Sequence, residues 1–130
     1  DWSAWTDKGD HDFQTIALVK VAAEPPWDSV AFHAQQAAEK YLKAYLVFRG
    51  QQPPKVHDLL KLVELCAAFD AEFTDLADDA DFLSPLAVFA RYPGDPAEPS
   101  RSDAERGVRI AERVRDVVRT HLPTIGETEQ

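Results

Sequence analysis

The chain lacks methionine entirely and has one cysteine among its 130 residues. A single cysteine cannot form a disulfide within the chain or a cysteine-rich zinc site. Cys66 falls in an apolar helical pattern, which indicates plain packing. Because even the first position is not methionine, we expect that the native N-terminus is not included. No apolar run is long enough to span a membrane, and no secretory signal opens the chain, so we expect a cytoplasmic protein.

Basic charge is also scarce. The chain has 14 lysines and arginines against 23 aspartates and glutamates, which gives a net charge of -9. This balance excludes a global positive field for nucleic acid, although a local basic patch remains possible. With 45% hydrophobic and 28% charged residues, the composition is that of an ordinary globular domain, and the length predicts one domain over residues 1–130.

Three groups of prolines divide the chain, at residues 25–26, 53–54 and 93–99. The segments between them have helical spacing, and none shows the alternation typical of a strand. The sequence therefore predicts an all-α fold, an antiparallel up-and-down bundle of four to five helices. The expected helices run from Trp2 or Asp10 to Ala23, from Asp28 to Arg49, from His57 to Phe69, from Phe73 to Tyr92 with a candidate break at Pro85, and from Ser102 to Leu122.

The second of these helices contains the stretch FHAQQAAEKYLKA, residues 32–44, and is predicted to be central. Its apolar side chains fall on two nearly opposite faces of a helical wheel, and a helix that is apolar on two sides is surrounded by partners. Gln35 and Glu39 share the second face, one turn apart. Either Asp28 or Ser29 is expected to cap the helix. A separate polar stripe consists of His33, Gln36, Lys40 and Lys43.

Gln35 and Glu39 need partners, because burying either one unpaired would cost several kcal/mol. The partners must be cations or hydrogen-bond donors, and the candidates are His57, Arg91 and Tyr92. Two interpretations remain open. One is a structural polar network that fixes helix register or a dimer contact, and the other is a polar groove for a nucleotide or RNA.

His57 and Asp58 begin the third expected helix, and either of them can act as its N-cap. The alternative is that His57 faces the same groove as Glu39, where the pair could act as acid and base, although nothing places a nucleophile beside it. Lys40 and Lys43, by contrast, are expected to be solvated.

We expect no metal and no cofactor. The sequence contains no zinc motif, glycine-rich phosphate loop or nucleophile elbow. The aspartates from Asp75 to Asp81 lack the central glycine and terminal glutamate of a calcium loop. The acidic run that includes His11 and Asp12 is interpreted as the solvated start of the first helix.

The order of motifs resembles that of the HEPN family, the higher-eukaryote and prokaryote nucleotide-binding domains, over nearly the whole chain. The stretch at residues 32–44 is followed by Gly50, by Pro53-Pro54, by His57-Asp58-Leu59, by Arg91-Tyr92-Pro93 and by a last helix rich in alanine and valine; Trp5 and Asp12-Phe13 fit the family's first helix. The resemblance implies an all-α bundle that is usually dimeric. It also implies a partner, since such proteins are often encoded beside a minimal nucleotidyltransferase in toxin–antitoxin-like pairs.

Many members of that family are ribonucleases with an arginine followed four to six residues later by a histidine, near the end of the fourth long helix. At the corresponding place this chain has Arg91 but no such histidine. Arg115 and His121 satisfy the spacing within the last helix, and we interpret them as a chance match. The chain is similar to the subgroup that carries the Arg-Tyr-Pro motif, so we expect no catalytic residues.

The resemblance and the second helix together predict a non-catalytic nucleotide- or RNA-binding module that forms a homodimer and works with a nucleotidyltransferase. Arg91 would face phosphate and Tyr92 would stack or donate a hydrogen bond. The expected ligand-binding residues are Gln35, Glu39, Lys43, His57, Arg91 and Tyr92. Two alternatives remain: a ribonuclease that uses Arg115 with His121 or Arg91 with His57, and a purely structural dimer scaffold.

Overall fold

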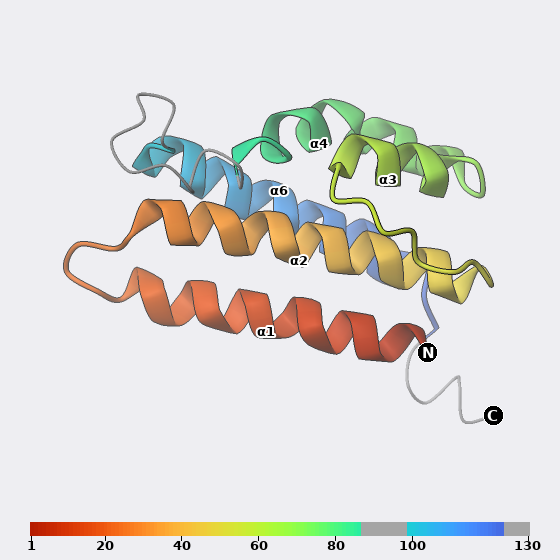
Figure 1. Cartoon of the computed structure of the whole chain (residues 1–130), viewed down its shortest axis with the longest axis horizontal. Coiled ribbons are helices and arrows are strands. Elements are labelled where there is room, and N and C mark those ends of the chain that lie inside the picture. The colour runs from red at the N-terminus through yellow and green to blue at the C-terminus, as the bar shows by residue number, and fades with distance from the viewer. Residues whose placement is uncertain (87–98, 124–130) are drawn as a thin grey trace.

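The computed structural model describes residues 1–86 and 99–123 and contains only helices in these ranges (Figure 1). The all-α prediction is therefore confirmed. None of the helices in these two ranges is long and apolar enough to cross a membrane. The elements are α1 (Trp2–Lys20), α2 (Trp27–Phe48), α3 (Leu59–Ala67), the 3-10 helix η1 (Ala71–Leu76), α4 (Ala77–Leu83) and α6 (Arg101–Thr120).

Helix α2 is the centre of the bundle, as predicted. It runs antiparallel to α1 on one side and packs against α6 on another, while α3 and α4 cover the remaining side (Figure 1). Thirteen of its 22 residues are buried. Because these residues lie on more than one face, the helix cannot be a surface helix with a single apolar stripe.

Helix α2 packs through small side chains in one part of its length and through aromatic rings near its C-terminal end. Ala34 and Ala37 are fully buried, and such small side chains let neighbouring helices approach closely. A Cβ atom added to Gly107 of α6 would lie 3.1 Å from a methyl carbon of Leu83. Tyr45 supplies bulk near the other end of α2, where its ring centroid lies 4.5 Å from that of Phe73.

The predicted cap of α2 is wrong. The N-cap residue is Pro26 and not Asp28 or Ser29, although Asp28 Oδ1 accepts a hydrogen bond from the N–H of Ser29 within the first turn, at 2.9 Å. The reason is that the carbonyl oxygen of Pro26 already accepts hydrogen bonds from the N–H groups of Ser29 and Val30, at 3.0 and 3.2 Å. The first turn of α2 therefore starts at Pro26, before both of the residues that were predicted as caps.

Helix α3 begins with the side-chain cap that the sequence predicts. Asp58 caps α3, since its side chain accepts a hydrogen bond from the N–H of Leu60 at 3.0 Å. The predicted fourth helix begins earlier than Phe73, as η1, and continues as α4 to Leu83. The helix thus ends two residues before Pro85, although Ser84 between them still has helical backbone angles. Proline has no backbone N–H, so position 85 cannot donate the next helical hydrogen bond. The rest of the predicted segment, to Tyr92, lies outside the described residues.

Candidate functional site

Three polar residues of α2 lie one turn apart on one face and are buried among other helices. Gln35, Glu39 and Lys43 are 2%, 5% and 5% exposed. The predicted burial of Gln35 and Glu39 is confirmed, but the expectation that Lys43 is solvated is wrong. Its ammonium nitrogen lies 3.1 Å from Glu39 Oε2, so the lysine is the buried partner of the carboxylate.

Glu39 is the hub of this network. Its carboxylate contacts Lys43 Nζ at 3.1 Å, Gln35 Nε2 at 3.3 Å and His57 Nδ1 at 3.1 Å. Three donors compensate a buried carboxylate for the water that it loses. No buried side-chain nitrogen or oxygen in the described ranges is left without a partner. The network is therefore complete in itself.

His57 is the member of the network that faces solvent. Its side chain is 80% exposed, although Glu39 is almost fully buried. Gln35 Nε2 also donates to the backbone oxygen of His57, at 3.1 Å, so the residue is held at both its ring and its main chain. A hydrogen bond from Nδ1 to the carboxylate leaves Nε2 available to a ligand. Asp58 caps α3, as predicted, and His57 contacts Glu39; an acid–base role of that pair stays a prediction.

Gln36 joins the same network from outside, since its Nε2 donates to Gln35 Oε1 at 2.7 Å. The predicted polar stripe that contained Gln36 is therefore split. Lys43 and Gln36 belong with Glu39, whereas His33 and Lys40 turn toward α1.

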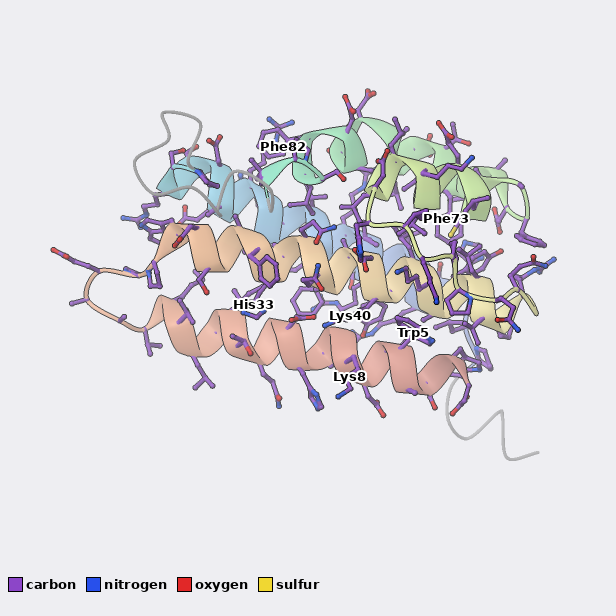
Figure 2. The ribbon with its side chains drawn as sticks, in the orientation of Figure 1. Trp5, Lys8, His33, Lys40, Phe73 and Phe82 are labelled. Atoms are coloured by element: carbon purple, nitrogen blue, oxygen red, sulfur yellow. The ribbon has the colours of Figure 1, made fainter. Side chains whose placement is uncertain are left out.

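Trp5 is a site residue that the sequence reasoning missed, although it was noted among the motifs of the first helix. It comes from α1, and Lys43 Nζ lies 5.7 Å from the centroid of its ring, within the range of a cation–π contact. Figure 2 shows Trp5 between the ribbons of α1 and α2. Trp5 also borders a hollow of about 340 Å³, whose lining is Asp1, Trp5, Val47, Gly50, Gln51, Gln52 and Pro53.

A second polar cluster ties α1 to α2. Asp12 is only 6% exposed, and its two carboxylate oxygens contact His33 Nδ1 at 2.8 Å and Lys40 Nζ at 2.6 Å. Figure 2 shows His33 and Lys40 in the space between the two helices. The interpretation of Asp12 as part of a solvated helix start is wrong, because the partners that bury it come from a distant part of the sequence.

The two residues with ribonuclease-like spacing have separate partners. Arg115 Nε contacts Asp116 at 3.0 Å, and its guanidinium lies 4.8 Å from the ring centroid of Phe13. His121 instead lies between the carboxylates of Asp70 and Glu72, at 3.1 and 2.8 Å. Arg115 and His121 therefore do not form one shared site for a ligand.

His121, Asp70 and Glu72 are the residues in the described ranges that could hold a cation, with ligand atoms within 4.8 Å of one another. Each ring nitrogen of His121 already faces one of the carboxylates. An imidazole can direct only one nitrogen at a given metal ion. Side chain–side chain pairing therefore accounts for this arrangement.

Burial raises the pKa of other titratable groups on and beside α2, among them Tyr41, Tyr45 and Cys66. It raises the pKa of the Cys66 thiol to about 12, and the resulting lack of thiolate makes this cysteine chemically inert at neutral pH, in agreement with a packing role. Burial, together with a hydrogen bond to Asp10, also raises the pKa of Tyr41 to about 12. None of these groups is poised for acid–base chemistry near pH 7.

Arg91 and Tyr92, the remaining predicted ligand-binding residues, lie outside the described residues. Their proposed contacts with phosphate, and the assignment to the Arg-Tyr-Pro subgroup, stay predictions. Of the six predicted residues, the structure brings together Gln35, Glu39, Lys43 and His57 in one connected network.

Comparisons with known proteins agree with this architecture. No curated protein and no solved structure matched the chain. A family model, that of the HEPN domain, matches residues 2–121, which include every helix described above and the whole polar network of α2. The chain belongs to the HEPN domain family.

Proposed function

We propose that this HEPN domain is a non-catalytic nucleotide- or RNA-binding module whose ligand contacts the exposed edge of the α2 network. The observation that carries the proposal is the state of His57, which is exposed at its ring yet fixed by a buried carboxylate. A histidine on a simple surface loop needs no such support. Membership of the HEPN family supports a role with nucleotides or RNA.

The network divides the predicted residues into two roles. Gln35, Glu39 and Lys43 are too buried to touch a ligand, so they act as positioning residues. Glu39 holds the imidazole of His57, and Lys43 contacts both Glu39 and the ring of Trp5. His57 and Trp5 are therefore the described groups that would meet the ligand.

The chemistry of these two groups suits a nucleotide. A base stacked on an aromatic ring gains about 1–3 kcal/mol. The ring of His57 faces Glu39 with Nδ1, so Nε2 is the atom that it presents to a phosphate oxygen or to the edge of a base. The exposed amides of Gln51 and Gln52 line the hollow beside Trp5 and can read the edge of a base.

A structural scaffold is the second candidate. It is favoured by the completeness of the network, because every buried polar side-chain atom in the described part of the chain has a partner without any ligand. Such a network can fix helix register or give a homodimer its specificity. The ribonuclease alternative has less support, since Arg115 and His121 have separate partners.

The proposal extends to partners through the family resemblance. We infer a homodimer that works with a minimal nucleotidyltransferase in a cytoplasmic, toxin–antitoxin-like pair. Sedimentation of the purified chain and co-purification with the product of the neighbouring reading frame test this part. A monomer that binds no such neighbour contradicts it.

Calorimetric titration with ATP, GTP and a short RNA tests the site. His57→Ala and Trp5→Ala are expected to weaken binding about tenfold or more each, the loss of one stacking or charge-assisted contact. His11→Ala is the matched control, because His11 is an exposed histidine of α1 with no side-chain role in the network. Absence of heat at millimolar ligand, or binding that both site variants retain, contradicts the proposal and leaves the scaffold.

A further inference from the structure

Arginine is concentrated in α6, although the chain as a whole is strongly acidic. Six of the eight arginines lie in this helix, which has only four acidic residues, so the helix carries a surplus of two positive charges while the chain carries -9. The arginines of α6 are Arg101, Arg106, Arg109, Arg113, Arg115 and Arg119.

Three of these arginines form one row beside α4. Arg106, Arg109 and Arg113 are all exposed, and with Ile110 and Asp79 they line a hollow of about 280 Å³. We call these five residues the arginine groove. The spacing of three and four residues keeps the three side chains on one face of the helix, over a rise of about 10 Å.

Each arginine of the groove is held to a different degree. The guanidinium of Arg106 lies 3.8 Å from the ring centroid of Phe82, the α4 residue labelled in Figure 2. Arg113 Nη1 lies 2.8 Å from Asp79 Oδ2. Arg109 has no ion pair or side-chain hydrogen bond within residues 1–86 and 99–123. One carboxylate therefore faces three guanidinium groups, and the groove is positively charged.

The chemistry of the groove favours a phosphate backbone over a protein surface. Guanidinium forks bind phosphate through two parallel hydrogen bonds, and stacking on an aromatic ring holds such a fork in place. Ile110, the one lining residue with an apolar side chain, is only 5% exposed, so the groove presents no exposed hydrophobic anchor for the core of a protein interface. A row of charges suits successive phosphates better than a single anion.

We propose that the arginine groove binds the phosphodiester backbone of single-stranded RNA. The inference rests on the proposed function for its ligand class, but it uses no residue of the α2 network. RNA would thus contact two surfaces of the domain: a base at Trp5 and His57, and the backbone along α6. Contacts of this kind position a strand without reading its sequence.

Fluorescence anisotropy with a labelled ten-nucleotide oligouridine tests the groove. Arg106→Gln/Arg109→Gln is expected to weaken binding at least tenfold at low salt. It should also lower the slope of log affinity against log salt by about 1.4, since each phosphate contact on a single strand contributes about 0.7. Arg101→Gln is the matched control, because Arg101 is an exposed arginine of α6 that pairs with Glu105 outside the groove. The control should bind as the wild type does.

The same titrations with ATP separate this inference from the proposed function. Unchanged ATP binding in the double variant, together with weakened RNA binding, supports both. RNA binding that survives the double variant, or a wild type that binds ATP but not RNA, overturns the groove alone. A chain that binds neither ligand overturns both proposals. Displacement of the RNA from the wild type by a glutamate-rich peptide at lower concentration than by unlabelled RNA overturns the groove in favour of an acidic protein partner. Unchanged thermal unfolding of the double variant verifies that it folds.

Discussion

Helix α2 meets α1 through a polar seam, and it meets α3 and α6 through an apolar core. On the first side, Asp12 contacts His33 and Lys40, and Tyr41 donates a hydrogen bond to Asp10. On the other sides most neighbours are aliphatic, aromatic or alanine side chains, and the core cluster that they form also includes Ile16 of α1.

The difference between the two contacts has a physical reason. Apolar burial is non-directional and supplies most of the free energy of folding, but it tolerates small slips between helices. Hydrogen-bonded charges are worth less in net terms and are costly to mispair, so they favour one register. Trp5 comes from α1 and His57 from the segment before α3, so the register of α1 on α2 decides whether the two lie near the same network.

The largest effect is expected in the apolar core. Leu42 is fully buried, and Leu42→Ala should lower the free energy of unfolding by about 2–5 kcal/mol through lost transfer energy and a residual cavity. Urea denaturation measures this change. Leu18→Ala is the control, because Leu18 is 73% exposed and should cost almost nothing. If Leu42→Ala lowers the free energy of unfolding no more than Leu18→Ala does, the apolar core is not the main source of stability.

The polar seam should respond less to the loss of its central group. Asp12→Ala is expected to lower the free energy of unfolding by about 2 kcal/mol, because it leaves His33 and Lys40 without their shared partner. The same urea experiment applies, with the exposed Asp7→Ala as control. If the seam fixes register, Asp12→Ala should also weaken nucleotide binding at Trp5, whereas Leu42→Ala should not once folded protein is compared.

These two sides were not equally visible in the sequence. The apolar faces of α2 repeat with helical spacing, so its central position and the burial of Gln35 and Glu39 could be predicted from periodicity alone. Lys43 could not, because on a helical wheel it lies between the two faces. It is buried by Trp5 of α1, which is a tertiary contact that periodicity does not encode.

Asp12 illustrates the same limit more strongly. Three neighbouring acidic residues indicate a solvated helix start, and the local pattern contains nothing against that interpretation. The partners of Asp12 are 21 and 28 residues away along the chain. Asp12 meets His33 and Lys40 only when α1 packs on α2. Predicting these ion pairs would therefore have required the arrangement of the two helices in space, and not only their positions in the sequence.

Tyr41 gives the seam a pH dependence of smaller size. Burial and the hydrogen bond to Asp10 raise its pKa from 10.0 to about 12, which means that the folded protein favours the neutral phenol. The stabilisation that comes from the neutral phenol of Tyr41 is complete below pH 10 and is lost as the pH rises from 10 to about 12. We expect the wild type to lose about 1.4 kcal/mol of unfolding free energy relative to Tyr41→Phe by pH 11, the first half of this window, as the linkage relation requires.

The measurement is the difference between urea midpoints of the wild type and Tyr41→Phe at pH 9, 10 and 11. Taking the difference cancels the titration of lysines, which both proteins share. A difference that stays constant from pH 9 to pH 11 contradicts a raised phenol pKa. Cys66 in the apolar core also has a pKa raised to about 12, by burial alone, but both proteins contain it, so its titration cancels in the same difference.

The smallest expected effect concerns the rate at which a reagent modifies Cys66 in the folded protein. The thiol is fully buried, its Sγ lies 3.6 Å from the backbone oxygen of Leu42, and its pKa is raised to about 12, so thiolate is scarce and shielded at pH 8. We expect a chromogenic disulfide reagent to modify native Cys66 only as fast as the bundle opens, and urea-unfolded Cys66 at once. Ala17→Cys in a Cys66→Ala background is the comparison, because position 17 is exposed on α1 and should react immediately in the native state. The same reaction also compares the two sides of α2. Leu42→Ala should speed the modification of Cys66 more than Asp12→Ala does, because the core and not the seam excludes water from the thiol. Equal acceleration by the two variants would show that both sides of α2 open together, as one cooperative unit.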